Sequence, residues 1–312
     1  MTFLPQRTLS RELPADGGLF LPREIPFAGE RKEAILNLSF HACTAYVLNA
    51  LFDTQITGAD VELCVGKRPI RLRDLGQKTV MLECWHTPSG SEEPLLGAFA
   101  RLLRGTASEA VPGDWARIAI HAALLIASLG ELRRAGVLEP GQPADFCAVS
   151  GNLGEVMSGW YVRQWGFPVG AVLCACNENS EMWELLHQGC LKTDGVAVPT
   201  KTPACDVSVP SGAERLLFAC GGTEEVWAFR SCLELGAPYV PGQETLEAMR
   251  RGLSVYVIGQ RRMERIRRGI RSNTGYVLSG YDALCYGSMQ DHRASGAENR
   301  TCILLAQYAP EQ

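Results

Sequence analysis

A short glycine-containing stretch, SGNLG at residues 150–154, follows the apolar run FCAVS and precedes an amphipathic segment. A turn between a strand and a helix presents backbone N–H groups that attract an anion such as phosphate. Ser150 adds a hydroxyl and Asn152 an amide, and the two glycines let the backbone approach a ligand closely. A tight structural turn is the alternative interpretation. The candidate phosphate- or cofactor-binding residues are Ser150, Gly151, Asn152, Leu153 and Gly154.

Alternating apolar and amphipathic segments must position this loop. Residues 146–150 and 169–176 are unbroken apolar runs, which are typical of buried strands, and TVMLECWH at 79–86 is a further strand candidate. Apolar spacing predicts one helix over 33–52, another over 114–135, and a third in AERLLFACGG that ends at its paired glycines. This alternation predicts an α/β fold with a mostly parallel sheet and helices on both faces.

Composition limits the class of partner. The 312 residues carry a formal net charge of -4, so neither nucleic acid nor a membrane surface is expected as a partner. The N-terminus lacks the apolar segment of a secretory signal, which favours a cytoplasmic protein.

Twelve scattered cysteines with no C-x-x-C pair favour reduced, buried thiols and no metal site. The arginine-rich stretch at 261–271 has an apolar stripe, which favours an amphipathic helix with a solvated basic face over a contact surface for an acidic partner or nucleic acid.

Six stretches, in order along the chain, resemble the threonine synthase family of pyridoxal-phosphate (PLP) enzymes of fold type II. The resemblance implies a large domain of that fold, a role in amino-acid biosynthesis and lyase chemistry, and a cofactor phosphate held by the SGNLG loop. The stretches are DGGLFLP, LECWHTP, DWARI, VSGNLGEVMSG, TPACDVSVPSGAERLLF and GYVLSGYDA.

The resemblance fails at the residue that would do the chemistry. In the family, a lysine after the His-Gly-Pro turn forms the Schiff base, and that position falls on Glu93 here. A carboxylate cannot form an imine with an aldehyde. His86 matches the histidine of the turn, and a new acid–base set or metal site of His86 with Glu92 and Glu93 is a weaker alternative. The chain has only five lysines: Lys32, Lys67, Lys78, Lys192 and Lys201.

The chain departs from the family pattern at two further places: the small mobile domain and the residue that contacts the cofactor ring. The family's small mobile domain has no counterpart, because only a short segment separates Glu93 from Trp115. We therefore expect an N-terminal helical segment at 1–78 and an α/β large domain at 79–312, with an internal deletion between 94 and 113. Gln307 falls near the family's hydroxyl partner of the pyridine nitrogen, and its amide offers a softer replacement.

These features lead to three functional hypotheses. The first is a regulatory or phosphate-ligand-binding pseudoenzyme with no catalytic residue and with no cofactor or weakly, non-covalently bound PLP. The second is a working PLP-dependent threonine synthase or phospho-amino-acid lyase, and the third is a structural subunit that binds no ligand. The missing small domain should also uncover apolar surface, so a homo- or hetero-oligomer is expected.

Overall fold

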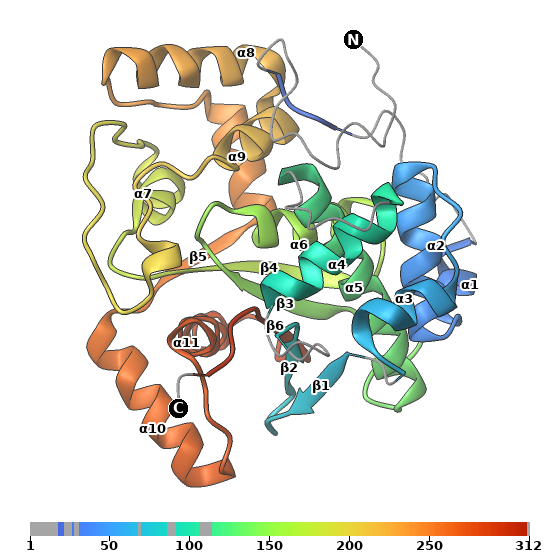
Figure 1. Ribbon diagram of the computed structural model, residues 1–312. Helices are drawn as coiled ribbons and strands as arrows, with labels where there is room; N and C mark the ends of the chain where they lie inside the picture. The colour runs from blue at the N-terminus through green and yellow to red at the C-terminus, as the bar shows by residue number, and fades with distance from the viewer. Residues whose placement is uncertain are drawn as a thin grey trace.

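A six-stranded sheet forms the centre of the computed structural model, which describes residues 18–21, 27, 31–67, 70–85, 92–105 and 114–310, with backbone only at 92–94. The strand order is β1-β2-β6-β3-β4-β5, in which β1 is an antiparallel edge strand and all other neighbours are parallel. The α/β class and the mostly parallel sheet are thus confirmed (Figure 1). The strands are β1 (Arg71–Asp74), β2 (Thr79–Glu83), β3 (Ala144–Val149), β4 (Val169–Cys176), β5 (Ser254–Val257) and β6 (Cys302–Ala306).

One face of the sheet packs against α5 (Asp114–Arg134) and α6 (Gly154–Gln164), which share the larger hydrophobic core with Leu82, Phe146 and Leu305. Of the described helices, α5 alone is long and apolar enough to cross a membrane, but 89% of its apolar window is buried inside the protein. It is therefore the central helix of this core. The other helices of this core are α1 (Arg31–Leu36), α2 (Phe40–Phe52), α3 (Gly58–Val65), α4 (Glu92–Arg104), α7 (Glu181–Gln188), α8 (Ala213–Leu235) and α9 (Gln243–Gly252).

The opposite face of the sheet is covered by α11 (Gly280–Ala294), against which α10 (Gln260–Thr274) packs. Met81 and Leu304 point to this side, because alternate residues of a strand face opposite ways. The apolar stripe of the arginine-rich segment lies here, with Met263 and Ile270 buried. Helices therefore lie on both faces, as the sequence pattern predicts (Figure 1).

One predicted helix is wrong in extent, and the predicted end of another is confirmed. The single helix expected over 33–52 is broken into α1 and α2, since the Ser39 side chain accepts the N–H of Ala42 and starts a new helix. The helix expected to end at paired glycines does so: within α8 (Ala213–Leu235), Gly222 has a non-helical backbone, with φ of 79° and ψ of -164°, and a second helical stretch follows it. A glycine adopts a positive φ at low cost, so the helix is interrupted by a kink at this point.

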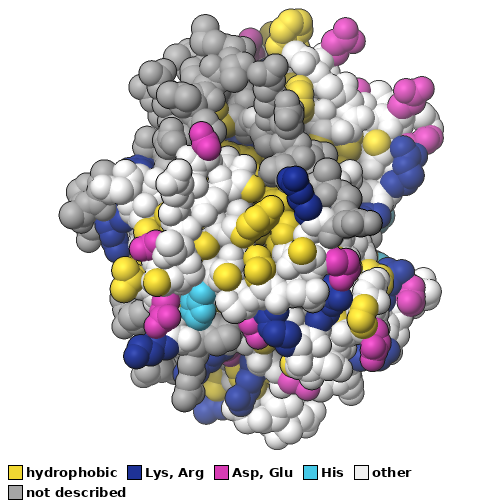
Figure 2. All heavy atoms as spheres, turned by 90° about the vertical axis from the view of Figure 1, so that its right-hand side faces the viewer, with side chains coloured by type: hydrophobic (Ala, Val, Ile, Leu, Met, Phe, Trp, Pro, Cys, Tyr) yellow, Lys and Arg dark blue, Asp and Glu magenta, His cyan; other side chains and the backbone are white. Residues whose placement is uncertain are grey.

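The cysteines and the surface fit an ordinary packed protein. All twelve cysteines are free, and most are buried. The described residues contain no group of three or more metal-ligating side chains. On the face that includes α1, α2 and α3, several hydrophobic side chains lie near the centre, and charged side chains lie below them and to the sides (Figure 2).

Candidate functional site

The carboxyl ends of the parallel strands form one edge, and ligands in open α/β sheets bind outside that edge where the strand order reverses. Here β6 lies between β2 and β3, so the reversal falls beside β6. The 150–154 loop follows β3 and Gln307 follows β6, which places both predicted elements at this point.

The 150–154 loop is a tight turn closed by its own hydrogen bonds. Gly151 and Leu153 have φ of 36° and 67°, and the second value is unusual for a side-chain-bearing residue. The N–H of Leu153 donates to the carbonyl of Ser150 at 2.6 Å. The N–H of Gly154 donates to Oδ1 of Asn152 at 3.0 Å. The donors left for an anion are the N–H groups of Glu155 and Val156 in the first turn of α6, because the N–H of Met157 donates to the carbonyl of Leu153.

A second segment, residues 203–212, packs over the 150–154 loop from outside; we call it the clamp. The N–H of Gly212 donates to the carbonyl of Asn152 at 2.9 Å. The thiol of Cys205, in the 3₁₀ turn Pro203–Cys205, contacts the N–H of Gly151 and the hydroxyl of Ser150. Burial raises the pKa of Cys205 to about 12, although those two donors lower it, so this thiol stays protonated. The clamp explains why the loop is mostly buried, a feature that the sequence pattern does not show.

Gln307 lies next to the start of α6. Its Nε2 donates to Oε1 of Glu155 at 2.6 Å, and both side chains are at least 94% buried. Glu155 directly follows the loop, so a carboxylate occupies the neighbourhood proposed for an anion. The sequence pattern gave no reason to single out Glu155, because an acidic residue in the first turn of a helix is common.

A polar network after β4 supports the same edge and was not foreseen. Asp206 Oδ1 accepts from Nδ2 of Asn177 at 2.8 Å and of Asn179 at 3.1 Å, and from the Thr200 hydroxyl at 2.6 Å. This network fixes the chain that leads to Cys205 and so to the clamp. The available signal was NEN, polar residues placed directly after the buried run VGAVLCAC.

A buried arginine joins three of the stretches on which the family resemblance depends. Arg215 is fully buried, and its Nε donates to Oδ2 of Asp114 at 2.6 Å. Its Nη1 donates to the carbonyl of Phe20 at 2.6 Å. The stretches DGGLFLP, DWARI and GAERLLF therefore meet around one charged group, whose burial requires such partners.

The structure describes only part of the two residues, His86 and Glu93, that the resemblance places at the former catalytic site. His86 lies outside the described residues. Glu93 lies in the first turn of α4, where the structure gives its backbone alone. The assignment of Glu93 to the lysine position, and the acid–base pair with His86, remain predictions.

All five lysines belong to the described part of the chain, and the contacts recorded for them are with residues outside the 150–154 loop. Lys32 Nζ lies against Gly166 beyond the far end of α6, which for an eleven-residue helix is about 16 Å from the loop. Lys78 donates to the carbonyl of Asn299, beside the amino end of β2. Lys192 and Lys201 pair with Glu184 and Glu264 and are more than half exposed, and Lys67 is exposed beyond α3.

The donor set can be tested against the cofactor that the resemblance implies. A PLP enzyme needs an amine for the imine, donors for the phosphate and a partner for the ring nitrogen. The lysines do not supply the amine, and the Gln307 amide donates to Glu155. The residues present therefore do not fit covalently bound PLP. The first turn of α6 still offers N–H groups to a phosphate.

Comparison with known proteins places these features in a family context. No protein-family model matches the chain. Threonine synthase of Eremothecium gossypii is 36% identical over 80 residues, which is 25% of this chain and 16% of that protein. Threonine synthase of Pseudomonas aeruginosa is 30% identical over 127 residues, or 38% of this chain and 24% of that protein. The mouse protein "Threonine synthase-like 1" is 28% identical over 107 residues, which cover 34% of this chain and 14% of that protein.

The structural likeness extends further than the sequence likeness. The PLP-bound threonine synthase of Brucella melitensis superimposes with a TM-score of 0.83 at 18% identity, over 98% of this chain and 86% of that chain. The yeast threonine synthase gives a TM-score of 0.81 at 17% identity, over 98% and 84% of the two chains. At such identities the likeness establishes the fold, while the aligned stretches of sequence span less than a quarter of each curated relative named above.

Proposed function

We propose that this chain, which is similar to threonine synthases in short stretches of sequence and has their fold, binds a phosphate-bearing small molecule at the 150–154 loop and does not form an imine. The observation that carries this proposal is the presence of a strand–loop–helix turn of the kind that binds anions, while the recorded contacts of the lysine amines lie at other residues. The protein then keeps the scaffold of its relatives without their carbon chemistry.

The donors available to the ligand make this a phosphate site of modest strength. The N-terminal turn of α6 provides N–H groups and the positive end of the helix dipole, which favour an anion. The Glu155 carboxylate opposes a second negative charge nearby. PLP, held without a covalent bond, or a phosphorylated amino acid would be bound through its phosphate alone. We propose a regulatory role for such binding, in which the ligand stabilises one state of the protein.

An oligomer is the second part of the proposal. Loss of the small domain would leave apolar surface that a homodimer or a heteromer covers. Sedimentation velocity at micromolar concentration is the measurement, and a monomer under those conditions would contradict this part.

The decisive experiment is an absorbance spectrum of the purified protein with added PLP, before and after borohydride. An enzyme with an internal imine absorbs near ~410–420 nm and is fixed by the reductant. We expect neither the band nor a reduced adduct on a lysine. A lysine-linked adduct would establish the alternative, a working PLP-dependent synthase or lyase.

A thermal-shift assay tests binding separately from chemistry. A ligand that binds the native state raises the melting temperature, and we expect this with PLP and with inorganic phosphate. Asn152→Asp places a carboxylate in the loop and should abolish the shift, while the exposed Asn299→Asp should leave it unchanged. No shift with either ligand in the unchanged protein would favour the structural subunit, which binds nothing.

A further inference from the structure

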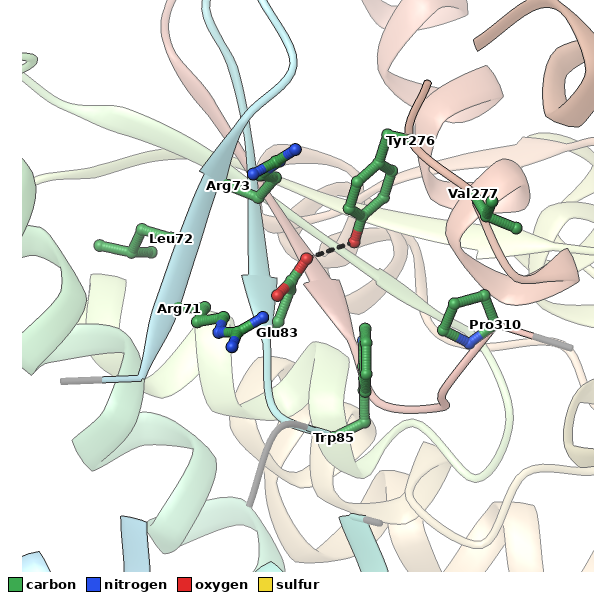
Figure 3. Close-up of a pocket in the computed structure, with 8 residues that line it drawn as sticks. All are labelled: Arg71, Leu72, Arg73, Glu83, Trp85, Tyr276, Val277 and Pro310. Carbon is green, nitrogen blue, oxygen red and sulfur yellow. Dashed lines mark hydrogen bonds between the residues drawn. The ribbon is translucent and has the colours of Figure 1, made fainter. Parts of the chain in front are cut away.

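A cavity of about 480 Å³ lies beside the edge strand β1, which β2 and β6 separate from β3 and its loop. Arg71 and Arg73 extend into it from β1, and Glu83 and Trp85 come from the end of β2 (Figure 3). Arg71 is directly opposite Glu83 in the antiparallel pair, and Arg73 is two residues along the same strand, so all three project on one face of the sheet. The strand pairing therefore brings two guanidinium groups and one carboxylate to a single hollow.

The carboxylate at the base of the cavity is held in place. Glu83 is 3% exposed, and its Oε1 accepts the hydroxyl of Tyr276 at 2.6 Å. Burial, and then this hydrogen bond, raise the pKa of Tyr276 well above its usual range, so the hydroxyl remains a donor. The guanidinium carbon of Arg73 lies 5.8 Å from the centre of the Tyr276 ring, which also favours a fixed side-chain position.

The rim and the walls of the cavity have different chemistry. Both arginines are exposed, and together they exceed the Glu83 carboxylate by one positive charge. The walls are aromatic or apolar, formed by Trp85, Tyr276 and Pro310. A volume of this size with apolar walls and a few convergent polar groups is typical of a small-molecule site.

We propose that this cavity binds a small organic monocarboxylate, with its carboxylate on Arg71 and Arg73 and its apolar part against Trp85, Tyr276 and Pro310. Planar guanidinium groups bind carboxylates through paired hydrogen bonds. A single excess positive charge matches a monoanion, and Glu83 opposes the second charge of a phosphate. The proposal is independent of the phosphate site, because the cavity and the 150–154 loop share no residue.

The test is isothermal titration calorimetry of the whole protein with 3-phenylpropionate, and with phenethylamine as the cation of matched size. We expect the acid to bind and the amine to fail. Arg73→Gln should weaken binding of the acid about tenfold or more, because a charge-assisted hydrogen bond to a carboxylate is lost. Arg268→Gln, on α10 outside this cavity, should leave binding unchanged.

A second measurement locates the ligand. In the Trp85→Phe variant, one indole N–H resonance disappears from the spectrum, which identifies the Trp85 signal in the unchanged protein. We expect that signal to shift when 3-phenylpropionate is added. Undetectable binding of the acid, binding that is equal in Arg73→Gln, or preferential binding of the amine would overturn the proposal. A circular dichroism melt shows that each variant is folded, as the exposed position of Arg73 leads us to expect.

Discussion

The side-chain amide of Gln307 donates a 2.6 Å hydrogen bond to the carboxylate of Glu155, inside the protein and one residue beyond the 150–154 loop. This contact ties the end of β6 to the start of α6 across the point where the strand order reverses. Gln307 therefore positions the helix from which the proposed anion donors come.

Replacing Gln307 by Leu should destabilise the protein by about 1–3 kcal/mol, because the buried Glu155 carboxylate loses a donor. The measurement is urea unfolding followed by circular dichroism. Gln188→Leu, at an exposed position at the end of α7, is the control and should change the free energy of unfolding by much less. Equal effects of the two substitutions would show that the contact contributes nothing.

Glu155→Gln should strengthen phosphate binding at the loop, because it removes a carboxylate from the first turn of α6 and leaves the side-chain shape unchanged. At a partly buried site, one charge of this kind near an anion changes affinity by about tenfold. The thermal shift produced by inorganic phosphate should therefore grow. A smaller shift in Glu155→Gln would place the anion away from this turn.

Gly212→Ala should disturb the loop directly. A Cβ at this position would lie 2.4 Å from the carbonyl oxygen of Asn152, which is backbone and cannot move alone. Overpacking of this kind costs about 1–3 kcal/mol, and we expect both a lower melting temperature and a smaller shift with phosphate. In contrast, Gly269→Ala in α10 meets open space and should stabilise the helix slightly. If Gly212→Ala kept the full thermal shift with phosphate, the contact between Gly212 and the loop would not be needed for phosphate binding.

Asp282 should give the protein a pH-dependent stability. Burial raises the pKa of this carboxyl to about 6, from 3.8, although the N–H and hydroxyl of Ser279 lower it. The native state therefore binds the proton more tightly than the unfolded chain, and this contribution is present below about pH 4 and lost as the pH rises through 6.

Asp282→Asn cannot lose a proton and keeps an oxygen to accept the Ser279 N–H. Its free energy of unfolding relative to the unchanged protein should therefore rise by up to about 3 kcal/mol between pH 4 and pH 7. Urea unfolding at several pH values is the measurement. The exposed Asp194→Asn is the control and should run parallel to the unchanged protein. A constant difference between Asp282→Asn and the unchanged protein across this range would mean that Asp282 does not titrate there.

Local pattern predicted most of the elements but misplaced some of their ends. The buried runs at 146–150 and 169–176 became β3 and β4, because unbroken apolar residues need burial on both faces of a parallel sheet. The helix expected over 33–52 failed because the single N-cap at Ser39 outweighed the continuous apolar spacing. The paired glycines did stop the first half of α8, because Gly222 takes a non-helical backbone conformation there, and a second helical stretch follows it.

The sequence by itself determined the α/β class, the strand–loop–helix unit at 150–154, the family resemblance and the small number of lysines, because each depends on residues adjacent or ordered along the chain. The tertiary structure alone decided that Gln307 meets Glu155, that Cys205 and Gly212 close over the loop, and that two arginines face Glu83 across a cavity. These contacts join segments as much as 152 residues apart. Strand order and register set them, and neither leaves a local trace in the sequence.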